Sequence, residues 1–203
     1  MREKLTTDDE SNHGRSGILA PPDITSGVDA EAQLNDLAFS VGQRLAASCA
    51  RIVTAESCTG GAIARALTER AGSSAWFDRS FITYSNQAKV DLLGVPSMML
   101  EKYGAVSEPV ARAMAIGALQ SLAPAQPGLA LSVTGIAGPG GAVAGKPVGT
   151  VCFGWAGRMS PNGPIWATTS TCHWDGEREI VRRAAALHAL STGLKHWLFN
   201  RVT

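Results

Sequence analysis

The sequence contains no long apolar run, no paired-cysteine motif and no excess of either charge. Because no stretch of about 18 apolar residues occurs, no membrane span is expected, and without an apolar signal core no export is expected either. The four cysteines lack CxxC or other metal-ligand spacing and the four histidines are scattered, so we predict no metal site and no cofactor. A net charge of +1 offers no electrostatic reason to bind nucleic acid or an anionic membrane. We therefore expect a cytoplasmic protein with reduced thiols.

The first thirty residues differ in composition from the rest of the chain. They are polar, contain a Pro-Pro pair and show no hydrophobic periodicity, so they bury too little apolar surface to offset the entropy of ordering. We predict a disordered extension over residues 1–30. The remaining residues, 31–203, have the length of a single domain. The hydrophobic content of 45% and the charged fraction of 17% indicate a compact core.

Beyond the extension, helical and strand patterns alternate along the chain. Short β-branched or apolar runs predict strands, and apolar residues recurring every three or four positions predict amphipathic helices. This order predicts a three-layer α/β/α sandwich around a mixed β-sheet, with a hairpin at the sheet edge. The strand at 128–135 is nearly all apolar and is expected at the centre of the sheet. The predicted helices cover 30–50, 59–72, 96–104, 107–123 (with Ser107 as N-cap) and 177–199, and the predicted strands 51–57, 80–85, 128–135, 149–157 and 165–174.

One glycine-rich stretch imitates a phosphate-binding loop. "GGAVAGKP", residues 140–147, fits the pattern G-x-x-x-x-G-K, but Pro147 stands where the motif needs a Ser or Thr hydroxyl for Mg²⁺. Lys146 is also followed by a predicted strand, whereas the motif opens a helix whose amides hold phosphate. The sequence therefore indicates a flexible loop with one lysine rather than an ATP-type site.

The densest chemistry lies in "TAESCTGG", residues 54–61, where a predicted strand gives way to a helix. Open α/β sheets bind ligands beyond the carboxyl ends of their strands, where helix N-termini present unpaired N–H groups. Gly60 and Gly61 let the backbone approach a ligand closely, and their amides are suited to an oxyanion or a phosphate. Ser57 and Cys58 are the two possible nucleophiles. A simple helix cap, formed by Ser57 or Thr59, is the alternative role for this stretch.

Two further strand ends carry polar groups. "FITYSNQAK" places Tyr84 at a strand end and Lys89 five residues later. A lysine in a dry pocket loses its proton more readily and can activate a hydroxyl directly or through a tyrosine; a half-buried tyrosine and a solvated lysine are the alternative. "SVTGIAGPGG" adds Thr134 and a glycine cluster that begins at Gly135. None of these stretches holds a histidine to serve as a base for Cys58, which favours a packing role for that thiol.

Together these stretches resemble the CinA C-terminal domain family, whose stand-alone members are nicotinamide-nucleotide amidohydrolases. The resemblance implies hydrolysis of the carboxamide of nicotinamide mononucleotide to nicotinic acid mononucleotide and ammonia, without a metal. It also implies that the protein binds a small-molecule substrate and forms a homo-oligomer. The matching stretches follow in order between residues 31 and 199: "TAESCTGG", "AGSSAWFDRSFITYSNQAKVDLLGV", "GAVSEPVARAMAIGAL", "SVTGIAGPGG", "KPVGTV" and "VRRAAALHAL".

Matched position by position, the resemblance implies Ser57 as the nucleophile, Lys89 as its general base and Tyr84 as a proton relay or orienting group. A direct attack by water that Ser57 only positions is the alternative. Glu56 is implied to orient Lys89 or to hold a ribose hydroxyl, and a surface carboxylate at a helix start is the alternative. Further contacts to the substrate or the oxyanion are implied for Thr59, Gly60, Gly61, Thr134 and Gly135.

The resemblance also implies an arginine for the substrate phosphate. Arg182 in "EIVRR" is the matching residue, and its planar guanidinium suits two-pronged phosphate binding. Arg183 is the adjacent alternative; neighbours on a helix point about 100° apart, so only one of the two should face the site. The chain departs from the family pattern by "TGIAGP" in place of "SGIAGP", which keeps a hydroxyl at Thr134, and by "GER" in place of "GDR" before the last helix.

Three other functions compete with this interpretation. Direct DNA binding is disfavoured by the near-neutral charge and by the lack of a basic stripe. A non-catalytic domain that binds a nucleotide or a partner is a second alternative, although a binding site has no need of a nucleophile with its base. An amidase for another small amide is the third, and the sequence does not separate it from the first interpretation.

Overall fold

Five strands form one mixed sheet in a computed structural model that describes residues 27–201. Residues 1–26, most of the extension predicted to be disordered, lie outside the described range. The strand order is β2-β1-β3-β4-β5. β1 pairs in parallel with β2 and β3, whereas β4 is antiparallel to β3 and β5. The strands are β1 (Arg51–Glu56), β2 (Phe77–Ile82), β3 (Gly128–Gly135), β4 (Thr150–Arg158) and β5 (Ile165–His173).

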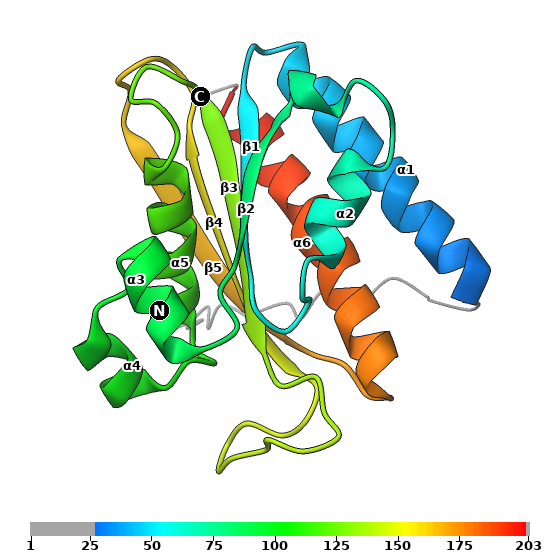
Figure 1. Cartoon of the computed structure of the whole chain (residues 1–203), viewed down its shortest axis with the longest axis vertical. Helices are drawn as coiled ribbons and strands as arrows, with labels where there is room; N and C mark the ends of the chain where they lie inside the picture. Colours follow the sequence, from blue (N-terminus) through cyan, green and yellow to red (C-terminus); the bar gives the residue numbers. More distant parts are fainter. Residues whose placement is uncertain (1–26, 202–203) are drawn as a thin grey trace, which may run out of the picture.

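Helices cover both faces of this sheet, so the predicted three-layer α/β/α sandwich is confirmed. In Figure 1 the sheet stands nearly edge-on, with α1, α2 and α6 on one side and α3, α4 and α5 on the other. Among residues 27–201 no helix is long and apolar enough to cross a membrane. The helices are α1 (Gly27–Ala46), α2 (Ala62–Thr68), α3 (Asn86–Leu93), α4 (Ser97–Tyr103), α5 (Glu108–Gln120) and α6 (Arg178–Phe199), with a 3-10 turn at Ser73–Ala75.

Each face of the sheet has its own hydrophobic core. Along β1, Ile52 belongs to the core under α1, α2 and α6, and Val53 to the core under α5, as the two-residue period of a strand requires. Small residues let α5 lie close to the sheet: a Cβ atom on Gly154 would stand 2.4 Å from the carbonyl oxygen of Ala111. The Ser132 hydroxyl donates to the same oxygen at 2.6 Å. β3 is buried at the centre of the sheet, and β4 and β5 form the hairpin at one edge, both as predicted.

Several elements differ from the sequence prediction. Helix α1 begins at Gly27, so the last residues of the predicted extension are helical, and β2 covers Phe77–Ile82 rather than 80–85. Two further differences help to form the site. The predicted helix 59–72 is reduced to α2. It starts later because Gly60 and Gly61 have φ angles of 61° and 93° and extend the loop that precedes it, and it ends earlier, at Thr68. Helix α3 was not predicted. It begins after Ser85, whose side chain accepts a hydrogen bond from the Ala88 amide, and ends at Gly94. Such a cap and glycine are ordinary helix boundaries, but the polar sequence between them has little periodicity.

Ser107 stands at the predicted N-cap position of α5, but it does not cap the helix with its side chain. Its hydroxyl donates to the Gly104 carbonyl at 2.8 Å instead. The hydroxyl thereby closes the turn between α4 and α5.

Candidate active site

The ends of three neighbouring strands meet at one edge of the sheet. β1 lies between β2 and β3 and runs parallel to both, so the residues that follow these strands are brought together. Backbone hydrogen bonds tie the three ends: the Ser57 amide donates to Val133 at 3.0 Å, and the Thr83 amide donates to Glu56 at 2.8 Å. The convergence expected from the sequence therefore places Ser57 between the ends of β2 and β3.

Ser57 and Lys89 form a buried pair. The Lys89 Nζ lies 3.2 Å from the Ser57 Oγ, although 32 positions separate the residues in the chain. Lys89 is 1% exposed and Ser57 is 8% exposed. The same nitrogen donates to the Thr83 carbonyl at 2.8 Å and lies 3.5 Å from the Ser85 carbonyl. Helix α3 makes this possible, because its first turn directs Lys89 back toward the end of β1.

Burial changes the acid–base chemistry of this pair. It lowers the pKa of Lys89, because an ammonium group loses its hydration in the interior. No carboxylate contacts Nζ among the hydrogen bonds and ion pairs of residues 27–201. A neutral amine can donate its two N–H groups to the Thr83 and Ser85 carbonyls and turn its lone pair toward the Ser57 hydroxyl. Lys89 can therefore take a proton from Ser57.

The Cys58 thiol is buried beside this pair and belongs to the hydrophobic core. Burial, together with the Glu56 carboxylate, raises the pKa of Cys58 to about 12, against weaker opposing effects of a backbone hydrogen bond and of Arg182 and Lys89. The thiolate is the reactive form of cysteine. A protonated, buried Cys58 supports the packing role predicted for it.

In the loop from Ser57 to Gly61, two of the amides that the sequence suggested for an oxyanion already donate to acceptors within the protein. The Gly60 amide donates to the Ser57 carbonyl at 3.1 Å, and the Gly61 amide donates to Glu56 Oε2 at 2.9 Å. By contrast, the hydrogen bonds of residues 27–201 include none from the Thr59 amide, and the Cys58 amide interacts only with its own thiol. The two amides that directly follow Ser57 are therefore the ones in this loop that donate to no carbonyl or carboxylate oxygen.

Tyr84 lies at the rim of the site and contacts a residue that sequence reasoning missed. Tyr84 is 60% exposed, and its hydroxyl accepts a hydrogen bond from Arg178 at 2.8 Å. The other guanidinium nitrogen of Arg178 donates to the Gly138 carbonyl at 2.8 Å. Arg178 thus connects the loops after β2 and β3. Arg178 lies four residues before Arg182 and therefore on the same face of α6, and this spacing could have identified it from the sequence.

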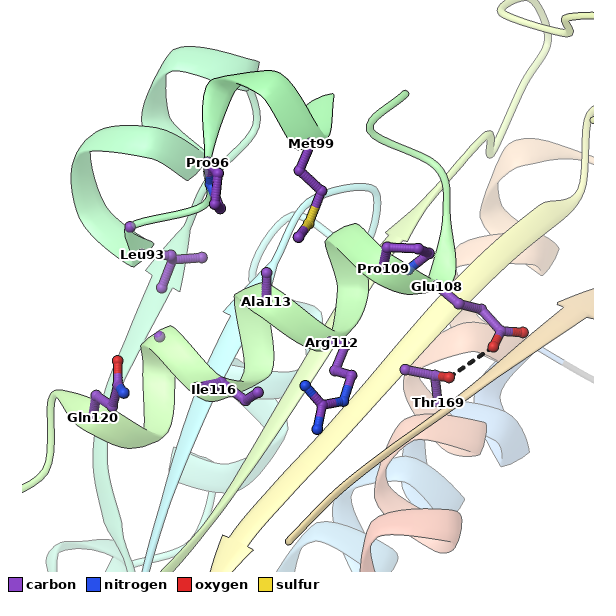
Figure 2. Close-up of a pocket in the computed structure, with 12 residues that line it drawn as sticks. Leu93, Pro96, Met99, Glu108, Pro109, Arg112, Ala113, Ile116, Gln120 and Thr169 are labelled. Atoms are coloured by element: carbon purple, nitrogen blue, oxygen red, sulfur yellow. Dashed lines mark hydrogen bonds between the residues drawn. The ribbon is translucent and has the colours of Figure 1, made fainter. Parts of the chain in front are cut away.

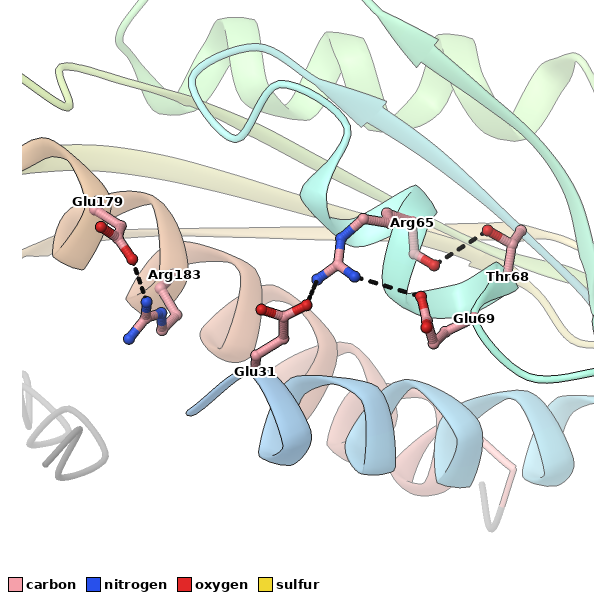
Figure 3. A network of polar contacts seen from close by, with 6 residues as sticks. All are labelled: Glu31, Arg65, Thr68, Glu69, Glu179 and Arg183. Carbon is pink, nitrogen blue, oxygen red and sulfur yellow. Dashed lines mark hydrogen bonds and ion pairs between the residues drawn. The ribbon is translucent and has the colours of Figure 1, made fainter. Parts of the chain in front are cut away.

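Arg182 and Arg183 point to different surroundings. Arg182 donates to the Thr59 carbonyl at 2.9 Å, and its buried Nε has no hydrogen-bond partner in the part of the chain that the structure describes. Arg183 pairs with Glu179 (Figure 3). Both arginines line a cavity of about 160 Å³ between α1, α2 and α6. Of the two, Arg182 is the one that contacts the Ser57–Gly61 loop.

Thr134 is buried, and its hydroxyl donates to the Ala105 carbonyl at 2.9 Å, so it also holds the turn before α5. Gly135 has no room for a side chain, since a Cβ atom would lie 2.9 Å from the Thr150 carbonyl oxygen. The glycine-rich stretch that imitates a phosphate-binding loop forms an antiparallel bridge between Val143 and Lys146, and β4 rather than a helix follows it.

A larger cavity of about 650 Å³ lies on the opposite helix layer, between α5 and the α3–α4 connection. Figure 2 shows its lining, with Glu108 accepting a hydrogen bond from Thr169 at 2.7 Å. None of the predicted site residues lines it. Within residues 27–201 no group of three or more His, Cys, Asp or Glu side chains could hold a metal ion.

Comparison with known proteins gives the family. The model of the CinA C-terminal domain matches residues 34–196. The chain belongs to this family. A relative from Enterobacter agglomerans, nicotinamide-nucleotide amidohydrolase PncC, is 49% identical over 170 residues, covering 84% of this chain and 99% of the relative. The protein of the same name from Escherichia coli K12 is 46% identical, with 84% and 98% covered.

Solved structures of CinA proteins have the same fold. The competence/damage inducible protein CihA from Agrobacterium tumefaciens superposes with a TM-score of 0.71 at 41% identity, covering 85% of this chain and 99% of that one. Longer CinA relatives also exist: a putative competence-damage inducible protein from Symbiobacterium thermophilum is 52% identical, but the match spans only 36% of its length.

Proposed function

We propose that this CinA-family chain is an amidohydrolase that converts nicotinamide mononucleotide and water into nicotinic acid mononucleotide and ammonia. The observation that carries the proposal is the buried Ser57–Lys89 pair, with Nζ and Oγ 3.2 Å apart. Relatives named for this activity, matched over nearly their whole length, support the choice of substrate. The lowered pKa of Lys89 supports its role as the base.

The reaction follows from the contacts of this pair. Lys89 takes the proton from Ser57 Oγ as the oxygen attacks the carboxamide carbon. The amides of Cys58 and Thr59 donate to the oxyanion that forms, where one such donor is typically worth about 3 kcal/mol. Collapse breaks the C–N bond, and Lys89 returns the proton to the leaving ammonia. A water molecule, deprotonated by Lys89, then attacks the ester carbon; the bond to Ser57 Oγ breaks, Lys89 returns the proton to this oxygen, and the carboxylic acid is released.

The proposed phosphate ligand is Arg182, aided by Arg178 on the same face of α6. Arg182→Ala is expected to raise the KM for nicotinamide mononucleotide about tenfold or more, since a hydrogen bond to a charged group contributes about 1.5–3 kcal/mol. Nicotinamide riboside, which lacks the phosphate, should show no such change. Arg183→Ala is the matched control, because Arg183 pairs with Glu179. An equal loss with the riboside would contradict phosphate binding by Arg182.

Substrate comparison tests the function itself and separates the amidase alternative. Ammonia release from nicotinamide mononucleotide should exceed that from nicotinamide and from NAD. Equal rates on all three would favour a general small-amide hydrolase. Release from none of them would favour the non-catalytic nucleotide- or partner-binding domain.

We also propose a homo-oligomer in the cytoplasm. All four cysteines are free thiols, which suits a reducing compartment. The outer strand β2 carries Asp78 and Arg79, whereas the other edge, β5, has no Lys, Arg, Asp, Glu or Pro in nine residues. Edges without such residues pair readily with another strand, so a second copy is the proposed neighbour of β5. Light scattering should give a multiple of 21.1 kDa, and Thr171→Lys should reduce it; a monomer for the wild type would contradict the proposal.

A further inference from the structure

The Glu56 carboxylate lies directly before Ser57, but it faces away from the Ser57–Lys89 pair. It is fully buried at the end of β1. Its Oε2 accepts hydrogen bonds from the Gly61 amide at 2.9 Å and the Ile63 amide at 3.2 Å. Its Oε1 accepts one from the Ala64 amide at 2.8 Å and a longer one from the Thr54 hydroxyl at 3.4 Å. It makes no hydrogen bond or ion pair with Lys89 within residues 27–201. Both oxygens are therefore used to hold the start of α2.

These hydrogen bonds replace a cap that α2 lacks. The N-cap residue of α2 is Gly61, which has no side chain to accept from the first amides of the helix. Glu56 supplies the acceptor from the adjacent strand instead. Its own backbone carbonyl accepts from the Thr83 amide at 2.8 Å, so the residue is fixed at both ends.

Glu56 consequently closes the loop that contains the nucleophile. Residues 57–61 follow Glu56 in the chain, and the amide of the last of them, Gly61, donates to the Glu56 carboxylate. With both ends of this loop held, the Ser57 hydroxyl lies beside Lys89, and the amides of Cys58 and Thr59 donate to no carbonyl or carboxylate oxygen among the described residues. A freely moving loop could instead turn these amides toward other acceptors.

We propose that Glu56 is a positioning residue, which sets the shape of the nucleophile loop by capping α2 and does not itself contact the substrate. The proposal rests on the proposed amidohydrolase function. It replaces the two roles that the resemblance implied for Glu56. Orienting Lys89 would need a contact between the two side chains, and holding a ribose hydroxyl would need an accessible oxygen. Full burial and three amide partners leave neither available.

The test combines kinetics with hydrogen exchange in Glu56→Gln. A glutamine keeps the size of the side chain but presents an NH₂ group to one of the amide donors, which loosens the loop. The kcat for ammonia release should fall about 100-fold, as expected for a small displacement of a reacting group, while KM changes less than about threefold, since ground-state binding is not touched. Amides of segment 57–64 should exchange faster than in the wild type. Glu56→Asp, which keeps a shorter carboxylate, should recover part of the kcat.

Ala66→Gly is the matched control. It weakens α2 by about 1 kcal/mol at a residue that makes no hydrogen bond with Glu56. Its melting temperature should be similar to that of Glu56→Gln, but its kcat should stay within about threefold of the wild-type value. Unchanged exchange of segment 57–64 in Glu56→Gln would overturn the proposal, as would an equal loss of kcat in Ala66→Gly or a KM that rises with the fall in kcat. A wild type that releases no ammonia would reject the proposed function, whereas the exchange data would still decide whether Glu56 holds the loop.

Discussion

Ser57→Ala should abolish ammonia release from nicotinamide mononucleotide, with kcat falling by a factor of about 10⁴ or more. Losses of this size follow the removal of a serine that forms a covalent intermediate. The substitution removes one oxygen atom from a residue that is 8% exposed, so the fold and the KM should change little. Initial rates with a coupled ammonia assay, together with thermal melting, measure both effects.

Cys58→Ala is the control for this prediction. The Cys58 thiol is buried, and its pKa is raised to about 12 by burial, so it stays protonated at neutral pH. The variant should keep kcat within a few-fold and lose only some stability from the small cavity it leaves. The reverse pattern, an active Ser57→Ala with an inactive Cys58→Ala, would assign the nucleophile to the thiol.

Lys89→Met should lower kcat about 10³-fold, which is within the usual range for the loss of a general base. Methionine fills a similar volume and suits the buried position, so the variant should stay folded. In the wild type, burial lowers the pKa of Lys89, and the neutral amine is the proposed base. The kcat should therefore rise with pH through this lowered pKa and level off above it.

The pH profile of kcat, measured for the wild type and for Lys89→Met, checks this role. The rising limb should be present in the wild type and absent from the residual activity of the variant. An identical profile in both proteins, or full activity of Lys89→Met, would contradict the assignment of Lys89 as the base.

The sequence predicted the layers of the fold well, because burial leaves a periodic signal. The apolar strand at 128–135 reads as central, and it is. The convergence of the β1, β2 and β3 ends also follows from the parallel arrangement alone. Helix α3 was missed, since a short polar helix shows little periodicity, and with it the path by which Lys89 reaches Ser57.

The direction of individual polar side chains was the least predictable part of the site. Glu56 precedes Ser57 in the chain, but whether its carboxylate faces the lysine or α2 depends on how the two glycines shape the loop between them. Arg178 was passed over for Arg182, although both lie on one face of α6. Its partners, Tyr84 and Gly138, come from loops more than thirty residues away, and no local pattern records such contacts.

The most direct test of the central claim is the stoichiometry of products formed from nicotinamide mononucleotide by the purified protein in the presence of EDTA. Ammonia and nicotinic acid mononucleotide should appear in equal amounts with the wild type, and neither should appear above background with Ser57→Ala. Equal turnover by both proteins, or no product from the wild type, would contradict hydrolysis by the Ser57–Lys89 pair.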